Sequence, residues 1–396
     1  MNRSPKRVLF VTPTYPDRPG GVRGTFIKDL ADELVRRGIA VDVLTPRIFE
    51  DSPAVEETDG VNITRFSFRS EQKILADYSS IPVKLMLSYM RCGIRALRRA
   101  LREGEYDILH GHWAIPTGLM AALGRRHRGI PLVISTHGSD LLVWGMKPGL
   151  KSLLRWTLRQ AQVCTANSEP LLNLTTELGG RTVPESLIFE TGVDIAQFHP
   201  ASDIAEAREA AGFEGTDLHV LFVGNLIGRK GIDLALQALS QLDTSESRVK
   251  FIIVGGGKER DALGDQAERL GVASQVQIVG PLSHDQLPPY FRACDVFLLP
   301  SRSEGMGIVL LEAAASGKPA IGTSVGGIPT IIRSGETGLI VPPEDSDALA
   351  LALAQLLRDK EMRLRMGQQA RQLAEREYSR DAQVGKLLTV YSHALS

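Results

Sequence analysis

Two glutamates on either side of a glycine-rich turn are the residues of this chain best placed to do chemistry. Glu304 and Glu312 belong to the stretch Ser301-Arg-Ser-Glu-Gly-Met-Gly-Ile-Val-Leu-Leu-Glu312. The apolar run 295–299 predicts a buried parallel strand before the turn, and the Leu- and Ala-rich run from Ile308 predicts a helix after it. Such a helix start favours a phosphate, whereas carboxylates beside it suit sugar hydroxyls. The simpler alternative is that Glu304 caps the helix and Glu312 is a solvated helix residue.

Two cations form a second candidate group. The glycine-containing segment Gly224-Asn-Leu-Ile-Gly-Arg-Lys-Gly231 follows the strand-like run 218–223 and precedes a helix expected from Ile232. Arg229 and Lys230 therefore meet a helix amino terminus at a strand end, a combination that favours a diphosphate. Two exposed basic residues at an ordinary helix start are the alternative.

Histidines follow two further strand-like runs. His137-Gly-Ser-Asp140 comes after the run 131–136, and His110-Gly-His112-Trp113 is expected to be a loop at the end of the run 106–110. Loops at strand carboxyl ends lie at the functional edge of a parallel sheet. No H-E-x-x-H motif or compact Cys/His set accompanies them, so no metal is expected. Asp345-Ser-Asp347 resembles a metal motif, but it directly precedes a helical run and is expected to cap it.

Strand-like runs alternate with helix-length segments along almost the whole chain, which predicts parallel sheets built from βαβ units. The 396 residues exceed one ordinary core, so two domains are expected. Turn chemistry around 191–200 interrupts the alternation. It predicts an amino-terminal α/β domain over 1–198 and a carboxyl-terminal one over 199–378.

Composition narrows the class of protein. The chain has 46 Lys and Arg against 46 Asp and Glu, so net charge gives no argument for nucleic acid. Three scattered cysteines, Cys92, Cys164 and Cys294, predict a reducing compartment and no disulfide framework. Without an 18-residue apolar run, a cytoplasmic protein is expected.

The segment Lys84 to Arg102 predicts a basic amphipathic helix. Its apolar stripe comprises Met86, Met90, Ile94, Leu97 and Leu101, and five arginines gather on another face. Such a helix can lie peripherally on the anionic inner face of a membrane. An ordinary domain helix with a solvated arginine face is the alternative.

Taken together, these motifs resemble the retaining, nucleotide-sugar-dependent glycosyltransferases of family 4 (glycosyl transferases group 1). The resemblance covers essentially the whole chain and is strongest over 220–343. It implies the GT-B fold, in which two Rossmann-like doubly wound parallel-sheet domains face each other across a cleft. It also implies that a helix over 379–396 crosses back onto the first domain. The expected activity is metal-independent transfer of a hexosyl unit from a UDP- or GDP-sugar to a glycan or lipid-linked acceptor, in polysaccharide or glycoconjugate biosynthesis.

The resemblance also assigns site residues. Arg229 and Lys230 would hold the donor diphosphate, Glu304 the sugar hydroxyls and Glu312 the ribose, with no cofactor. The full set that it assigns to donor binding is Gly20, Gly21, Gly224, Arg229, Lys230, Glu304, Gly305, Met306, Gly307, Ile308, Val309 and Glu312. The set that it assigns to catalysis is His137, Arg229, Lys230 and Glu304. Met306 and Thr330 depart from the family's frequent residues, an aromatic residue and Glu, so the sugar is left open.

Other functions stay open at this point. Gly255-Gly-Gly257 after a strand suggests an NAD-type oxidoreductase, although the dinucleotide fingerprint is incomplete. A GT-B sugar-nucleotide epimerase or a phosphorylase would share the fold. A sugar-nucleotide-binding protein without activity is a further alternative, against which the intact Glu304/Glu312 and Arg229-Lys230 pairs argue.

Overall fold

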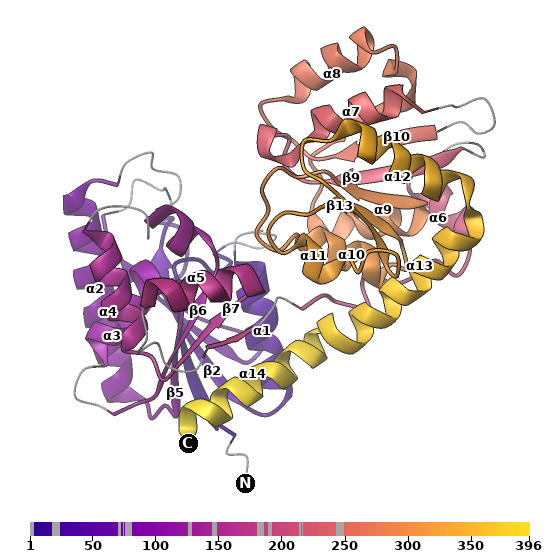
Figure 1. The fold of residues 1–396 in the computed structure, drawn as a ribbon. Helices are drawn as coiled ribbons and strands as arrows, with labels where there is room; N and C mark the ends of the chain where they lie inside the picture. Colours follow the sequence, from indigo (N-terminus) through magenta and orange to yellow (C-terminus); the bar gives the residue numbers. More distant parts are fainter. Residues whose placement is uncertain are drawn as a thin grey trace. The chain divides into compact units, whose positions relative to one another are not determined.

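The computed structural model describes residues 4–17, 24–69, 73, 75, 81–125, 129–144, 149–179, 186–188, 192–213, 215, 217–242 and 249–396. The chain divides into two compact units, each with its own sheet (Figure 1). The first comprises Met1–Thr191 together with Gln383–Ser396, and the second comprises Gly192–Ala382.

The sheet of the first unit has the strand order β3-β4-β2-β1-β5-β6-β7-β8. Its strands are β1 (Arg7–Val11), β2 (Ala40–Arg47), β3 (Val55–Thr58), β4 (Val61–Ser67), β5 (Ile108–His112), β6 (Leu132–Thr136), β7 (Val163–Ala166) and β8 (Ser186–Ile188). Among the strands that the structure describes, the polar edge strand β3 alone pairs antiparallel, and sequence patterning does not reveal it. The order reverses between β1 and β5, which are hydrogen-bonded neighbours.

Helices cover both faces of this sheet. The apolar side chains of β1 point to both faces, and burying them requires a helical layer on each. Val8 and Phe10 pack with α1 (Thr25–Arg36) and α14 (Arg380–Leu395), whereas Leu9 and Val11 face the opposite layer. That opposite layer comprises α2 (Val83–Glu103), α3 (Leu119–Gly124), α4 (Leu150–Arg159) and α5 (Glu169–Gly179). Such alternation without a polar face is expected of a strand buried in a parallel sheet. The final residues of the chain thus complete the core of the first unit.

The second unit has a fully parallel sheet in the order β11-β10-β9-β12-β13-β14. Its strands are β9 (Leu218–Val223), β10 (Val249–Val254), β11 (Val276–Gly280), β12 (Val296–Leu299), β13 (Ala320–Thr323) and β14 (Gly338–Val341). Its helices are α6 (Ile204–Ala210), α7 (Ile232–Ser240), α8 (Arg260–Arg269), α9 (Pro288–Ala293), α10 (Ile308–Ala315), α11 (Ile328–Ile331), α12 (Ser346–Arg358) and α13 (Lys360–Leu373). Numbered within the unit, the order is 3-2-1-4-5-6, that of a Rossmann fold, with the reversal between β9 and β12.

The prediction of two Rossmann-like doubly wound domains is confirmed. One local prediction is wrong: the strand expected to end at His110 continues to His112, so both histidines lie inside β5, opposite Val133 and Ser135 of β6. The ladder with β1 reaches Gly111 and the ladder with β6 reaches His112, so the strand extends to His112. Because alternate strand residues share a face, the two imidazoles stack, with ring centroids 4.1 Å apart.

The apolar stripe of α2 faces the core of its own unit. Leu97 and Leu101 are buried, and the remaining apolar residues of the stripe pack partly buried against the same cluster. The side chains of Arg91, Arg95 and Arg102 are exposed. The stripe is therefore not available to a bilayer, which leaves only the arginine face for such a contact. Within the described ranges, no helix is long and apolar enough to cross a membrane.

Candidate functional site

Two loops meet where the strand order of the second unit reverses. After β9 the chain runs through the turn η4 (Gly228–Lys230) into α7, and after β12 it runs through residues 300–307 into α10. The Arg302 amide donates to the Arg229 carbonyl over 2.8 Å. Gly231 adopts φ +67°, and a side chain there would collide with the Pro300 carbonyl. Ligands of open α/β sheets bind at this position, outside the carboxyl ends of the strands.

Lys230 and Glu304 form an ion pair between these two loops. Their side chains are 11% and 10% exposed, so the pair is largely removed from water. Glu304 also accepts hydrogen bonds from the Ser301 hydroxyl over 3.3 Å and the Gly305 amide over 3.2 Å. Arg229 is half exposed, with Nη1 3.9 Å from Glu304 Oε1. The structure thus brings the predicted cations and the first glutamate together.

The amino terminus of α10 lies directly after this pair. Its cap is Gly307, at φ +80°, and no side chain of the described residues caps the helix, so the capping alternative for Glu304 is wrong. The first amides of a helix have no partner within it, and here they include those of Ile308 and Val309. Gly305 and Met306 lie in the same turn, and the Gly327 amide donates to the Gly305 carbonyl over 2.6 Å. This arrangement offers donors and a positive helix end to an anion.

Gly224 directly follows β9, beside the same site. A side chain on it would lie about 3.2 Å from the Phe222 ring and 3.9 Å from Lys230 Cε. Gly255 and Gly257, by contrast, pack against the Gly224 carbonyl and Leu226 respectively. These two glycines therefore let neighbouring loops approach each other. This packing accounts for the glycines, so they no longer favour a dinucleotide site.

Glu312 lies inside α10 and is buried, with its side chain only 6% exposed. Its Oε1 is 3.0 Å from His284 Nε2, whereas its buried Oε2 has no hydrogen-bond partner within the described residues. A buried carboxylate oxygen without a donor costs free energy, so such atoms mark places where a ligand supplies the missing bond. His284 was not singled out from the sequence. Its only signal was its position shortly after the strand β11.

Arg302 is a second residue that the sequence did not reveal. Its guanidinium makes a bidentate pair with Asp233 of α7, with distances of 2.7 and 2.8 Å. Nη1 also donates to the Gly228 carbonyl over 2.7 Å, and Nε donates to Glu344 over 2.6 Å. The hydrogen bonds from Arg302 lower the pKa of Asp233 below its ordinary value. Arg302 therefore links the loop after β12 to the loop after β9.

The histidine cluster belongs to the first unit. His137 follows β6, and its amide donates to Asp140, as does the Ala114 amide over 2.7 Å. His137 Nε2 lies 3.4 Å from His112 Nδ1. Deeper in the unit, His110 contacts the Tyr391 hydroxyl over 2.9 Å and the Ser135 hydroxyl over 2.8 Å. His137 thus stands at the end of a polar array that reaches α14.

Burial dominates the electrostatics of this array. Desolvation lowers the pKa of His110 and of His137 to about 3, and lowers the pKa of His112 well below its ordinary value. The imidazoles are therefore neutral at pH 7. Burial also raises the pKa of Asp140 to about 6, although the amides that donate to it oppose this shift. The array offers hydrogen-bond donors and acceptors without positive charge.

Gly20 and Gly21 lie outside the described residues. Within those residues, no three His, Cys, Asp or Glu side chains gather as the ligands of one metal ion would. Asp345 of the possible metal motif caps α12, because its Oδ1 accepts from the Ala348 amide over 2.8 Å.

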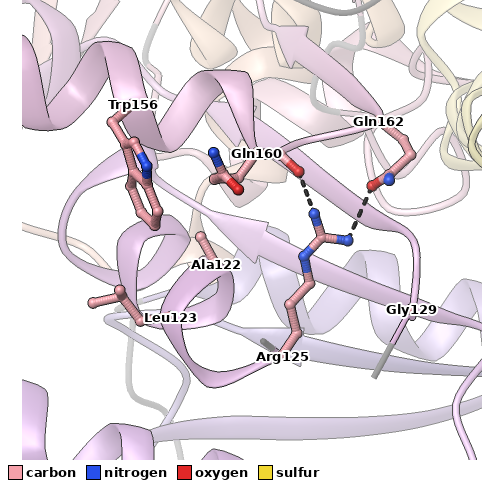
Figure 2. Close-up of a pocket in the computed structure, with 7 residues that line it drawn as sticks. All are labelled: Ala122, Leu123, Arg125, Gly129, Trp156, Gln160 and Gln162. Carbon is pink, nitrogen blue, oxygen red and sulfur yellow. Dashed lines mark hydrogen bonds between the residues drawn. The ribbon is translucent and has the colours of Figure 1, made fainter. Parts of the chain in front are cut away.

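The first unit contains a cavity of about 620 Å³ whose lining includes none of the candidate site residues (Figure 2). It is lined by Ala122, Leu123, Arg125, Gly129, Trp156, Gln160 and Gln162. Gln160 is the residue at the carboxyl-terminal cap of α4. Arg125 donates to its carbonyl, and also to Gln162 Oε1 over 3.2 Å. Gln162 Oε1 also accepts from the Leu132 amide over 2.7 Å. These bonds tie helix ends to the amino end of β6, so Arg125 and Gln162 of this cavity serve the fold.

Comparisons with known proteins address both units. Residues 203–373 match the family model "Glycosyl transferases group 1", and residues 20–188 match "Glycosyl transferase 4-like domain". N-acetyl-alpha-D-glucosaminyl L-malate synthase of Bacillus anthracis is 32% identical, over 75% of this chain and 77% of its own length. A GDP-mannose-dependent alpha-(1-6)-phosphatidylinositol monomannoside mannosyltransferase of Mycolicibacterium smegmatis is 30% identical, over 96% of this chain and 98% of its own length.

Among solved structures, Anabaena HepE in complex with UDP superposes with a TM-score of 0.76 at 21% identity. The likeness covers 98% of this chain and 99% of that one, and it shows the shared fold. Together with the family matches to both units and the relatives of 30% identity or more, it leads to one conclusion. The chain belongs to the glycosyl transferases of group 1 and has their GT-B fold of two Rossmann-like domains.

Proposed function

We propose that this glycosyltransferase is a retaining, metal-independent enzyme that moves a hexosyl unit from a UDP- or GDP-sugar to a hydroxyl of a glycan or lipid-linked acceptor. Its role would be in polysaccharide or glycoconjugate biosynthesis. The observation that carries the proposal is the Lys230–Glu304 pair, held at the reversal of strand order directly before the amino terminus of α10. Cation, carboxylate and helix end are the three groups that a sugar diphosphate requires together.

Each group has a part in the proposed reaction. The bond between the anomeric carbon and the diphosphate oxygen breaks, and its electron pair goes to the diphosphate. Lys230, Arg229 and the α10 amides stabilise this developing negative charge. The acceptor oxygen bonds to the anomeric carbon on the face that the diphosphate leaves, and its proton passes to the departing phosphate. Glu304 orients the sugar hydroxyls, so no protein nucleophile is required.

Glu312 is proposed to bind the ribose, because its Oε2, which has no hydrogen-bond partner among the residues that the structure describes, can accept from a ribose hydroxyl. In the first unit, His137 would contact the transferred sugar as a neutral imidazole, and Gly20 and Gly21 would approach the donor. Two similar proteins support a UDP- or GDP-sugar as the donor: the mycobacterial relative is GDP-mannose-dependent, and the HepE structure contains UDP.

The test is a panel of UDP-, GDP- and ADP-sugars added to the purified full-length chain, with a chelator and then with Mg²⁺ or Mn²⁺. One nucleotide family should raise the thermal unfolding midpoint and be slowly hydrolysed in the presence of the chelator. With an acceptor, NMR of the product should show the anomeric configuration of the donor. An inverted product would refute retention, and activity abolished by the chelator would refute metal independence. No response to any nucleotide sugar would refute the function itself.

We also propose that the arginine face of α2 lets the enzyme rest on an anionic membrane surface where it meets a lipid-linked acceptor. Arg91, Arg95 and Arg102 are exposed, and Lys84 and Leu87 continue this face toward the start of the helix. Because the apolar stripe serves the core, the contact would be electrostatic and weakened by salt.

A further inference from the structure

We propose that Arg302 and Asp233 are a positioning pair for catalysis, a clamp that keeps the cation loop after β9 in register with the carboxylate loop after β12. The inference rests on the proposed function, because it concerns how Lys230 and Glu304 are presented to the donor. It assigns a role to two residues that contact no substrate in the proposed mechanism.

The geometry of the clamp is specific. Arg302 lies two residues before Glu304, and Asp233 lies three residues after Lys230. Their bidentate bonds of 2.7 and 2.8 Å therefore bracket the Lys230–Glu304 contact. Two further bonds from Arg302 reach the cation loop: Nη1 to the Gly228 carbonyl over 2.7 Å, and the main-chain amide to the Arg229 carbonyl over 2.8 Å.

The clamp is needed because the ion pair itself cannot hold the loops once the donor binds. The proposed function asks Lys230 to turn its ammonium to a diphosphate and Glu304 to accept from sugar hydroxyls. Both then interact with the ligand as well as with each other, so their mutual attraction no longer fixes the loop spacing alone. A displacement of about 1 Å at a reacting centre can cost about 100-fold in rate. The Arg302–Asp233 pair stays intact while the catalytic pair engages the donor.

Arg302 is not itself placed to bind phosphate. A guanidinium has five N–H donors, and four bonds from that of Arg302 go to Asp233, Gly228 and Glu344. The bond to Glu344 is the most exposed, since that side chain is 58% accessible. The guanidinium of Arg302 is a planar fork that donates two hydrogen bonds to one carboxylate. An ammonium group lacks this geometry, so we expect lysine to replace Arg302 only in part.

The experiment measures steady-state kinetics of full-length variants with the nucleotide sugar that the wild-type chain turns over. Arg302→Gln and Asp233→Asn are each expected to lower kcat about 10- to 100-fold, while the donor KM changes less than about threefold. The double variant should be no worse than either single variant, because both break the same pair. Arg302→Lys should recover part of the loss. A purely structural role would instead lower the unfolding midpoint and leave kcat of the folded fraction unchanged.

A matched control exists in the same unit. Nη2 of Arg333 donates to both carboxylate oxygens of Glu377, over 2.8 and 2.9 Å, with side-chain exposures of 37% and 32% against 27% and 34% for Arg302 and Asp233. Arg333→Gln should keep kcat within twofold of wild type. An equal loss in this control, or additive losses in the double variant, would overturn the inference.

The remaining outcomes separate the two proposals. Normal wild-type turnover with an unaffected Arg302→Gln variant overturns the positioning role alone. Absence of wild-type binding and turnover with every nucleotide sugar ends the proposed function and this inference with it. Should Arg302→Gln not fold, Asp233→Asn decides by the same kcat criterion, because it keeps the size of the side chain.

Discussion

Lys230 and Glu304 combine a structural contact with the proposed chemistry, and substitution can separate the two. Their ion pair is largely shielded from water, so removing one partner leaves the other charge short of a partner. Such a loss typically costs about 1–3 kcal/mol of the free energy of unfolding. Removing both partners together avoids the unpaired charge.

Lys230→Ala and Glu304→Ala are therefore each expected to lower kcat by about 100-fold or more, as the loss of an electrostatic transition-state contact does. The double variant should regain part of the lost stability in urea unfolding but none of the activity. Lys258→Ala is the control, because Lys258 is an exposed lysine of the same unit. Near-wild-type turnover in either single variant would contradict the assignment.

At the scale of elements, the histidines on β5 and after β6 give the first unit a defined pH dependence. The folded pKa values of His110 and His137 are about 3, and that of His112 is also lowered, against about 6.5 when unfolded. Between pH 6.5 and 3 the unfolded chain therefore binds more protons, and stability falls as the pH falls. Asp140 acts oppositely: with its pKa raised to about 6, it keeps its proton in the folded state between pH 6 and 3.8.

The three histidines together change stability more than the one aspartate opposes it. The free energy of unfolding of the first unit should therefore fall steadily from pH 7 to pH 5. Urea unfolding at several pH values, followed by tryptophan fluorescence, measures this slope. His112→Asn should reduce the slope by about the contribution of one group. An unaltered slope in His112→Asn would show that this imidazole does not titrate on unfolding.

The arginine face of α2 carries the second prediction at this scale. Vesicles containing anionic lipid should bind the protein, and vesicles of phosphatidylcholine alone should not. Arg91→Gln/Arg95→Gln should weaken binding roughly tenfold or more, since each cation near the surface contributes about 1 kcal/mol. Lys258→Gln/Arg269→Gln removes the same charge from exposed sites of the other unit and serves as control. Binding unaffected by salt or by the α2 variant would refute the electrostatic contact.

At the scale of the whole molecule, the chain returns to its first unit at its end. Val384, Leu387, Val390 and Tyr391 of α14 are buried in the cluster that contains Val8 and Phe10. Each buried side chain of this size contributes about 1.5–3 kcal/mol. Their combined loss is comparable with the whole stability of a domain, about 5–15 kcal/mol.

A chain ending at residue 382 should therefore lose the fold of the first unit and keep that of the second. The three tryptophans, Trp113, Trp144 and Trp156, all belong to the first unit, so their emission reports that unit alone. The emission of Trp113, which packs partly buried against the same cluster as α14, should shift to the red, while circular dichroism keeps the cooperative transition of the second unit. Unchanged tryptophan emission would show that α14 is dispensable for the first core.

The sequence by itself determined the alternation of strands and helices, the two α/β domains and the motifs in the loops that follow β9 and β12. These are local properties, since burial period, glycine turns and helix starts extend over a few residues. Only the tertiary structure decided which loops meet. Lys230 contacts Glu304 across 74 positions because β9 and β12 are neighbours in the sheet, an order that no local pattern encodes. Strand pairing and register also decide the contacts of His284 and Arg302 and the stacking of His110 on His112. No local sequence pattern could therefore predict them.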